Sequence, residues 1–393
     1  MLRMRRRILL GGLGTGALAL LRSGSSPGRE RTSVRHRGTT SITVALGQRQ
    51  VTTWAKTDTN ASIDQDAQGA TWMILGDASA WAIYRGTSID HMQLEHRYQP
   101  DFPRPHADDL YWSSGLWIDR RSDTWYCAVH CEYNYGRYTG KPPTGPVPWS
   151  PDHRRRMVLV TSTDHGRHWT LIGDILTGAH PDDPRSAPGD YYDKGDGDGQ
   201  LYIDEHFFYM FYRTGWYQKS HDKFFETVRV ARCPLSGRMQ PGSWRKWYRG
   251  SWNEPGLHGF DSDVFNSNSG DTAAVFFSRH LGCYVALIGA GDPDVPEGYI
   301  ATCDSLDRQD WTDPIRFCDA ATHEDYNWVL DPQTLSRHVI EGRSFRYYTS
   351  KNTPPVWHEA TFGVAPAGAL VKPPLYPPDS VDDRNPGWDR SMR

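Results

Sequence analysis

The amino-acid sequence predicts an all-β protein, a β-propeller of five blades with about 70 residues in each. Composition is the first reason: 16 tryptophans and 20 tyrosines favour strands, while 37 glycines and 27 prolines favour turns. The second reason is a turn motif that recurs along the chain. The third is a group of four short apolar runs that recurs with it. A chain of 393 residues is too long to fold around one small hydrophobic core, and its length suits such a repeat.

The turn motif is clearest at Ser162-x-Asp164-x-Gly166-x-x-Trp169, directly after the apolar run MVLVT. An aspartate in a turn accepts hydrogen bonds from nearby backbone N–H groups, and a glycine adopts a positive φ without strain. The tryptophan can fold back over the two strands that the turn connects. The motif therefore predicts a tight turn in a β-hairpin.

Further copies of the motif give the length of the repeat. Ser305-x-Asp307-x-x-x-Trp311 begins 143 residues after Ser162, and a weaker copy begins at Ser88, 74 residues before it. The first interval is about twice the second, and the run ARCPLSG lies where the intermediate copy is expected. The repeat is thus about 72 residues long, and residues 41–366 hold about five copies.

Within each repeat, four short apolar runs are separated by turn residues, which is typical of propeller blades. The runs expected in the first blade are ITVAL, ATWMILG, WAIYRGT and LEHRY. Those of the second are SGLWID, TWYCAVHCEY, RMVLVTSTD and WTLIGDIL, and those of the third are GQLYID, HFFYMFYR, ETVRVARC and SWRKWYRG. The fourth has DTAAVFFS, GCYVALIG, GYIATCDS and WTDPIRF. The fifth has NWVLDPQT, SFRYYTS and EATFGVA, which an N-terminal strand would close. A pair of β-sandwiches with coincidental turns is the alternative.

Both ends of the chain are expected to lie outside the propeller. Residues 1–25 have a basic start, an apolar stretch and then small residues, which is the pattern of an export signal. The pair Arg5-Arg6 resembles a twin-arginine signal. Residues 26–40 are expected to be a flexible linker, and residues 367–393 a proline-rich tail. We therefore expect a secreted or periplasmic protein, without a membrane span in its mature form.

The charge of the mature chain argues against a nucleic-acid partner. Residues 1–38 hold nine arginines and one glutamate, so 44 − 9 = 35 basic and 47 − 1 = 46 acidic side chains remain. The net charge is then 35 − 46 = −11, whereas a nucleic-acid-binding protein needs a basic surface.

Six cysteines are present, and export would permit disulfide bonds. Cys127 and Cys131 lie four residues apart in one expected strand, roughly 13 Å from each other, which is too far for a bond. Cys283 and Cys303, on neighbouring expected strands, are the better pair.

The motifs also carry a family resemblance. Ser162-x-Asp164-x-Gly166-x-x-Trp169 resembles the Asp-box of sialidase-type propellers. Ser305-x-Asp307-x-x-x-Trp311 resembles the equivalent hairpin of five-bladed glycoside hydrolases of the arabinanase and fructosidase kind, and VRVARC with WRKW is similar to their third blade. The resemblance implies a carbohydrate-active propeller over residues 41–366. Asp-boxes lie on outer hairpins and also occur in propellers that are not enzymes, and the sialidase arginine triad is not recognisable here.

The second blade supplies the first candidate site residues. His106 and Asp109 precede its first strand, where a propeller opens into its central funnel. His130 and Glu132 alternate on its second strand and therefore share one face. Such a pair is costly to bury unless it is paired or used. A purely structural His–Glu pair is the alternative.

The third blade supplies an acidic stretch, GDYYDKGDGDGQLYIDE, which contains Asp196 and Asp198. Arg213 ends the next strand and is the counterpart of His130 in the repeat. These carboxylates could serve catalysis, bind calcium, or only shape turns around the glycines. Lys194 stands where a helical calcium-binding loop would begin with aspartate, so that type of loop is excluded.

Hydrolysis of a glycosidic bond is the first functional hypothesis, because it needs two carboxyl groups that flank the bond. Asp109, Glu132 and one of Asp196 and Asp198 would supply them. Burial and like charge would raise one pKa, as the proton donor requires. His130 and Arg213 would orient the acids or bind an anionic sugar. We expect a monomer that acts on a carbohydrate, with no required cofactor and no catalytic metal, although a calcium ion stays open.

Two other functions stay open. A lyase would cleave a uronate-containing glycan by β-elimination, using His106, His130, Tyr192 and Arg213 as acid, base and carboxylate binder. Propeller ulvan and rhamnose–glucuronate lyases are similar in this use of His, Tyr and Arg. They have seven blades where five are expected here, so this hypothesis ranks second. The third hypothesis is a glycan-binding propeller without catalysis.

Overall fold

The computed structural model describes residues 42–102, 109–133, 153–179, 191–218, 223–265, 272–292, 295–319, 322–323 and 326–364. All of them belong to the compact unit His36–Arg393. The export signal, the linker and the C-terminal tail expected from the sequence lie outside the described residues. No helix in the described part of the chain is long and apolar enough to cross a membrane.

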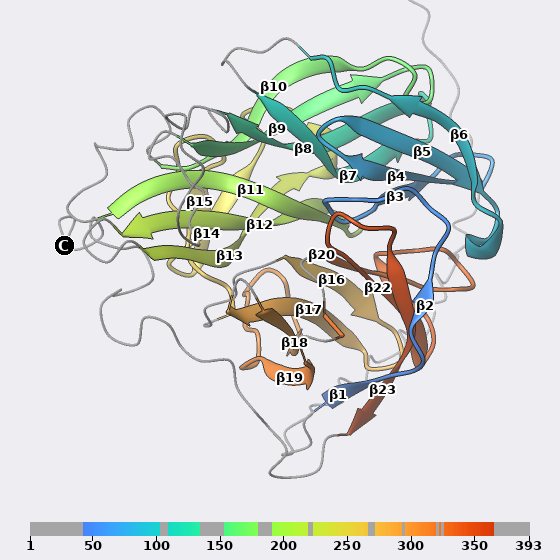
Figure 1. Ribbon diagram of the computed structural model, residues 1–393. Coiled ribbons are helices and arrows are strands. Elements are labelled where there is room, and N and C mark those ends of the chain that lie inside the picture. Colours follow the sequence, from blue (N-terminus) through green and yellow to red (C-terminus); the bar gives the residue numbers. More distant parts are fainter. Residues whose placement is uncertain are drawn as a thin grey trace, which may run out of the picture. The chain divides into compact units, whose positions relative to one another are not determined.

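The described strands form five successive groups of mainly antiparallel strands, called blades one to five (Figure 1). A contact between β11 and β9 joins blades two and three into one nine-stranded sheet. Blade one contains β3 (Ser62–Gln65), β4 (Thr71–Asp77), β5 (Ala80–Gly86) and β6 (Gln93–Tyr98), with the short 3-10 helix η1 (Ile89–His91). Blade two contains β7 (Leu110–Asp119), β8 (Thr124–Tyr133), β9 (Arg154–Ser162) and β10 (Thr170–Thr177). Blade three contains β11 (Tyr191–Ile203), β12 (Phe207–Gln218), β13 (Lys223–Pro234), η3 (Leu235–Gly237), β14 (Arg245–Tyr248) and β15 (Ser251–Pro255).

The last two blades complete the series. Blade four contains β16 (Ala273–Ser278), β17 (Cys283–Asp292), β18 (Val295–Cys303) and β19 (Ile315–Cys318), and β21 (Val339–Ile340) joins β16 in parallel. Blade five contains β20 (Tyr326–Leu330), β22 (Ser344–Ser350) and β23 (Val356–Val364), with β1 (Ile42–Leu46) and β2 (Gln50–Val51) paired to β23. The first strands contact one another in the order β3, β7, β11, β16 and β20 around the centre.

Strand alternation places each blade between two hydrophobic cores. On β4, Trp72 packs in the core between blades one and two, while the next residue, Met73, packs in the core between blades five and one. Three further cores lie between blades two and three, three and four, and four and five. Because the fifth core returns to blade one, the sheets form a closed series, which confirms the predicted five-bladed propeller.

The N-terminal strand β1 closes the last blade. β1 pairs along its whole length with β23, from Ile42 opposite Val364 to Leu46 opposite Ala360. The assignment of ITVAL to the first blade is therefore wrong, because β3 is the first strand there. The predicted closure of the fifth blade by an N-terminal strand is confirmed. An outer strand supplied from the other end of the chain covers an edge that would otherwise stay unpaired.

We expect the closing strand to contribute to stability through Val44, which is 3% exposed in the core between blades four and five. Val44→Asp should lower the free energy of unfolding by about 3 kcal/mol or more, because it buries an unpaired charge. Val51→Asp is the matched control: Val51 lies on β2, pairs with the same strand and is 63% exposed. Urea unfolding of both variants measures the difference, and equal losses would contradict this role for β1.

The hairpin between β9 and β10 has the predicted turn chemistry. Ser162 Oγ accepts hydrogen bonds from the N–H groups of Asp164 and Gly166, and it donates to Asp164 Oδ1 at 2.8 Å. Gly166 has a φ of 80°. Trp169 donates to the carbonyl of Gly166 and packs against Trp81. The turn therefore joins the outer hairpin of blade two to the core shared with blade one.

The predicted disulfide between Cys283 and Cys303 is wrong. All six cysteines are free. The register of β17 and β18 places Cys303 opposite Tyr284, so Cys283 and Cys303 lie on opposite faces of the sheet.

Candidate functional site

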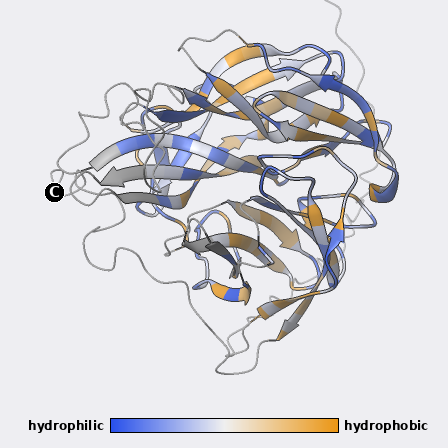
Figure 2. Ribbon diagram, in the orientation of Figure 1, coloured by the Kyte–Doolittle hydropathy of each residue, from blue (hydrophilic) through white to orange (hydrophobic). Residues whose placement is uncertain are grey.

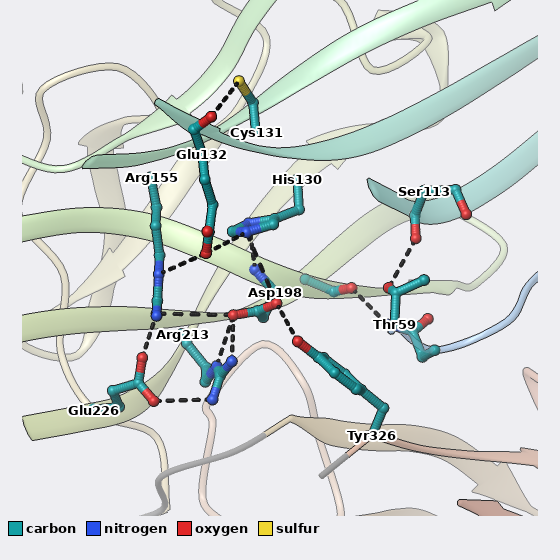
Figure 3. A network of polar contacts seen from close by, with 12 residues as sticks. Thr59, Ser113, His130, Cys131, Glu132, Arg155, Asp198, Arg213, Glu226 and Tyr326 are labelled. Carbon is teal, nitrogen blue, oxygen red and sulfur yellow. Dashed lines mark hydrogen bonds and ion pairs between the residues drawn. The ribbon is translucent and has the colours of Figure 1, made fainter. Parts of the chain in front are cut away.

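A buried polar network lies where blades two and three join (Figure 3). The first strand of blade three, β11, meets the third strand of blade two, β9, in a parallel contact between Gly195 and Arg155. The N-terminal half of β11, which contains this contact, is mostly hydrophilic (Figure 2). Side chains from five strands of blades two and three meet there with one side chain from β20 of blade five. These residues are called the polar network: His130, Glu132, Arg155, Asp198, Arg213, Glu226 and Tyr326.

His130 on β8 connects the two blades. Its Nδ1 accepts a hydrogen bond of 2.9 Å from the backbone N–H of Asp198. The ring proton is therefore on Nε2, which lies 3.1 Å from Glu132 Oε1 and donates to it. His130 is thus a neutral imidazole with both nitrogens engaged, and it fixes Glu132 relative to the backbone of β11.

Glu132 is held in its ionised form. Arg155 Nε lies 3.3 Å from Oε1, and His153 Nε2 lies 3.2 Å from Oε2. Burial opposes ionisation, but the interactions with His153 and the hydrogen bond from His130 outweigh it and hold the pKa of Glu132 well below its usual range. Burial lowers the pKa of His153 to about 4. Arg155 is therefore the permanent positive partner of this carboxylate.

Asp198 is also held in its ionised form, on a bulge of β11. Its φ of 46° turns the side chain out of the strand pattern between Gly197 and Gln200. Arg213 donates to Oδ2 from Nε at 3.0 Å and also from Nη2, while Tyr326 donates to Oδ1 at 3.1 Å. Burial opposes ionisation, but the charge of Arg213 and its neighbours holds the pKa of Asp198 well below its usual range.

Glu226 on β13 completes a ring of alternating charges. Arg213 Nη1 donates to Glu226 Oε2 at 2.9 Å, and Arg155 Nη1 donates to Oε1. Arg155 Nη1 also lies 3.8 Å from Asp198 Oδ2, so each arginine lies between Asp198 and Glu226. With Glu132, three carboxylates face two guanidinium groups, and the network therefore carries one net negative charge when its histidine is neutral.

The other predicted carboxylates lie elsewhere. Asp196 is fully buried beside Lys246 Nζ at 2.7 Å, in a separate cluster that includes Asp261. Burial raises the pKa of Asp196 to about 7. Asp109 accepts from Arg156 Nη2 at 3.2 Å. Because Leu110 pairs with Glu132, Asp109 lies on the opposite face of blade two from Glu132.

The structure therefore brings together His130, Glu132, Asp198 and Arg213 of the predicted set. His106 lies outside the described residues. Tyr192 lies on β11, but its side chain is outside the described part of the structure. Three members of the polar network were not predicted from the sequence: Arg155, Glu226 and Tyr326. A signal for Arg155 exists in the run RRRM at the start of β9, because strand alternation places one of its arginines on the face of Glu132.

His130, Glu132 and Asp198 offer ligand atoms that lie within 4.8 Å of one another, close enough for one metal ion to contact all three. The Nδ1 lone pair of His130 is occupied by a backbone N–H, and its Nε2 carries the proton. Both carboxylates already contact a guanidinium group. This donor set fits ion pairing with arginine better than cation binding. Calcium binding by the acidic stretch stays a prediction.

Because the pKa values of the Glu132 and Asp198 carboxylates are low, the free energy of unfolding should depend on pH in the acid range. Because the folded pKa lies below the unfolded value of about 4, each group stabilises the fold above that value. This stabilisation is lost as pH falls through the folded pKa. Urea unfolding between about pH 5 and 2 should therefore show a smaller loss in Asp198→Asn than in wild type, by at most about 1.4 kcal/mol per pH unit. Equal slopes would contradict the ionised state of Asp198.

Comparisons with known proteins return glycoside hydrolases, at low similarity. No protein-family model matches the sequence, and no curated protein matches it. The α-L-arabinofuranosidase of Podospora anserina in complex with cellotriose has 11% identity and a TM-score of 0.41, over 81% of this chain and 94% of that one. The arabinanase of Bacillus subtilis has 10% identity and a TM-score of 0.41, over 81% and 97%. A glycosyl hydrolase of Bacteroides ovatus has 11% and 0.41, over 84% and 96%. The chemistry of the site is therefore interpreted from its own geometry.

Proposed function

We propose that this protein is a carbohydrate-active enzyme that hydrolyses glycosidic bonds of a poly- or oligosaccharide. One observation carries the proposal: the carboxylates of Glu132 and Asp198 meet at the join of blades two and three, and both are ionised. His130 donates to the carboxylate of Glu132 and accepts from the backbone N–H of Asp198. A glycosidase needs a carboxylate that stays ionised, because it attacks the sugar, activates water or stabilises the oxocarbenium-like transition state. Asp198 and Glu132 fit these roles.

The proton donor is proposed to be a different group from the one expected. A donor with a raised pKa was expected among Asp109, Glu132, Asp196 and Asp198. Of these, Asp196 has a raised pKa, but Lys246 occupies its carboxylate. We propose Asp58 instead, a partly exposed residue before β3 whose charge helps to raise the pKa of Tyr326. Asp58→Asn should then lose less activity on aryl glycosides with good leaving groups than on the polysaccharide. A good leaving group departs without receiving a proton from the enzyme.

Elimination by a lyase is the second candidate, and the described geometry supports it less. A lyase needs a free base near the substrate. Both nitrogens of His130 are engaged, and burial together with the charge of Asp198 raises the pKa of Tyr326 well above its usual range. Arg213 is already bound to two carboxylates, so it is poorly placed to neutralise a uronate.

The test is a panel of plant, algal and microbial polysaccharides incubated with the purified protein. Two signals are followed: new reducing ends, and the ultraviolet absorbance of an unsaturated product. Reducing ends without absorbance support hydrolysis. Absorbance that rises with the reducing ends would replace hydrolysis by elimination. Binding to a glycan without either signal would overturn both enzymatic proposals in favour of a glycan-binding propeller. We further propose that the protein acts as a monomer after export.

A further inference from the structure

The connection between β20 and β21 brings an arginine into the centre of the propeller. This segment leaves blade five, and β21 then pairs in parallel with β16 of blade four. Arg337 lies just before β21 and is 5% exposed. Its Nη1 donates to the carbonyl of Ala61 at 2.6 Å and approaches Asn60 Oδ1 at 3.4 Å, while its Nη2 donates to Gln200 Oε1 at 3.0 Å. One side chain thus connects blades one, three and five.

These three acceptors are neutral, and their orientation is fixed. The amide nitrogen of Asn60 donates to the carbonyl of Gly199, and that of Gln200 donates to the carbonyl of Asn327. The amide oxygens therefore face Arg337, as a guanidinium group requires. No carboxylate among the described residues pairs with Arg337, and burial alone lowers its pKa, to about 10.

Three other buried arginines differ from Arg337 in this respect. A carboxylate oxygen lies within 4 Å of the guanidinium groups of Arg155, Arg156 and Arg229. A buried charge is costly unless a charge of opposite sign compensates it. Arg337 is charged at neutral pH and has only partial dipoles around it, so its environment lacks one negative charge.

Unused hydrogen-bond donors accompany this charge. A guanidinium group has five N–H donors, and the three contacts of Arg337 leave Nε–H and one N–H of Nη2 without a partner among the described residues. The neighbouring His338 accepts from the N–H of Ile203 through Nδ1, so its proton is on Nε2. That Nε2 is buried and finds no acceptor in the part of the chain that the structure describes. Two adjacent residues therefore hold donors that lack acceptors.

We propose that a small monovalent anion, chloride in the first instance, binds against the guanidinium group of Arg337 inside the propeller. The anion would accept hydrogen bonds from the free N–H groups of Arg337 and balance its single charge. Because Arg337 connects three blades, the bound anion would stabilise the closed ring, independently of the proposed hydrolysis.

The first test is the melting temperature of the purified protein at constant ionic strength, with chloride replacing isethionate, an anion too large for a buried site. Constant ionic strength removes general screening. An anion that binds only the folded state raises the melting temperature saturably, here by about 2–4 °C, and bromide should do the same. A melting temperature that is equal in both salts, or a rise that never saturates, would overturn the proposal.

Two further measurements locate the effect. Arg337→Gln should abolish the halide dependence, whereas Arg279→Gln, a change at a surface arginine whose side chain is 61% exposed, should leave it intact. A halide dependence that persists in Arg337→Gln would contradict the site. If Arg337→Gln does not fold, crystals of the wild-type protein grown in bromide decide the question. Anomalous scattering beside Arg337 is expected, and bromide bound only elsewhere would refute the assignment.

Discussion

Asp198→Asn is expected to lower kcat by about 10³-fold or more on the polysaccharide that the wild-type protein cleaves. Asparagine keeps the size of the side chain but removes the ionised oxygen that the proposed mechanism needs. The fold should survive, because Glu132 and Glu226 would then balance Arg155 and Arg213 with no net charge. Steady-state kinetics and the melting temperature, measured together, separate the loss of chemistry from a loss of structure.

Asp123→Asn is the matched control for this experiment. Asp123 has an exposed side chain and pairs with His165 on the surface of blade two. Its φ of 54° suits asparagine as well as aspartate. The control should keep wild-type activity. Full activity of Asp198→Asn would mean that the polar network is not the catalytic site.

Gly197→Ala should have the second largest effect, although it adds a single methyl group. A β-carbon at position 197 would lie well inside van der Waals contact with the imidazole of His130, and 3.0 Å from Arg155 Cδ. The imidazole would have to move, and its hydrogen bonds to Asp198 and Glu132 would be lost. We expect an activity loss of about 10²-fold, because a displaced network no longer holds the reacting groups in place. The free energy of unfolding should fall by about 1–3 kcal/mol.

Gly342→Ala separates this effect from a general sensitivity of glycines. A β-carbon at position 342 would meet Ser344 at 3.6 Å, an ordinary contact. Its activity and melting temperature should equal those of the wild type. If Gly197→Ala is as active as Gly342→Ala, the position of His130 does not matter for catalysis.

The fold could be predicted from sequence to a large extent, because its signals are local. Strand alternation, turn residues and the recurring Ser-x-Asp motif are visible within single hairpins, and they gave the strands of blades two, three and four. Closure of the ring is different, because it depends on a pairing between strands at opposite ends of the chain. The local sequence of ITVAL does not show whether this strand begins blade one or closes blade five. Its pairing with β23, at the other end of the chain, decides between these two places.

The candidate site could be predicted only where its contacts lie within one strand. His130 and Glu132 share a strand face by simple alternation, so their pairing follows from the sequence. Asp196 and Asp198 are equivalent in the sequence, but a bulge in β11 sends Asp198 to Arg213 and leaves Asp196 with Lys246. Glu226 and Tyr326 come from later strands whose proximity to Asp198 exists only in three dimensions.

The most direct test of the proposed function is the mass of the products formed in water labelled with heavy oxygen. Wild-type protein and Asp198→Asn are incubated in parallel with the polysaccharide that gives the strongest reducing-end signal. Hydrolysis at the polar network predicts one labelled oxygen in each new reducing end from the wild type, and almost no product from Asp198→Asn. Unsaturated products without label, or equal amounts of labelled product from both proteins, would contradict it.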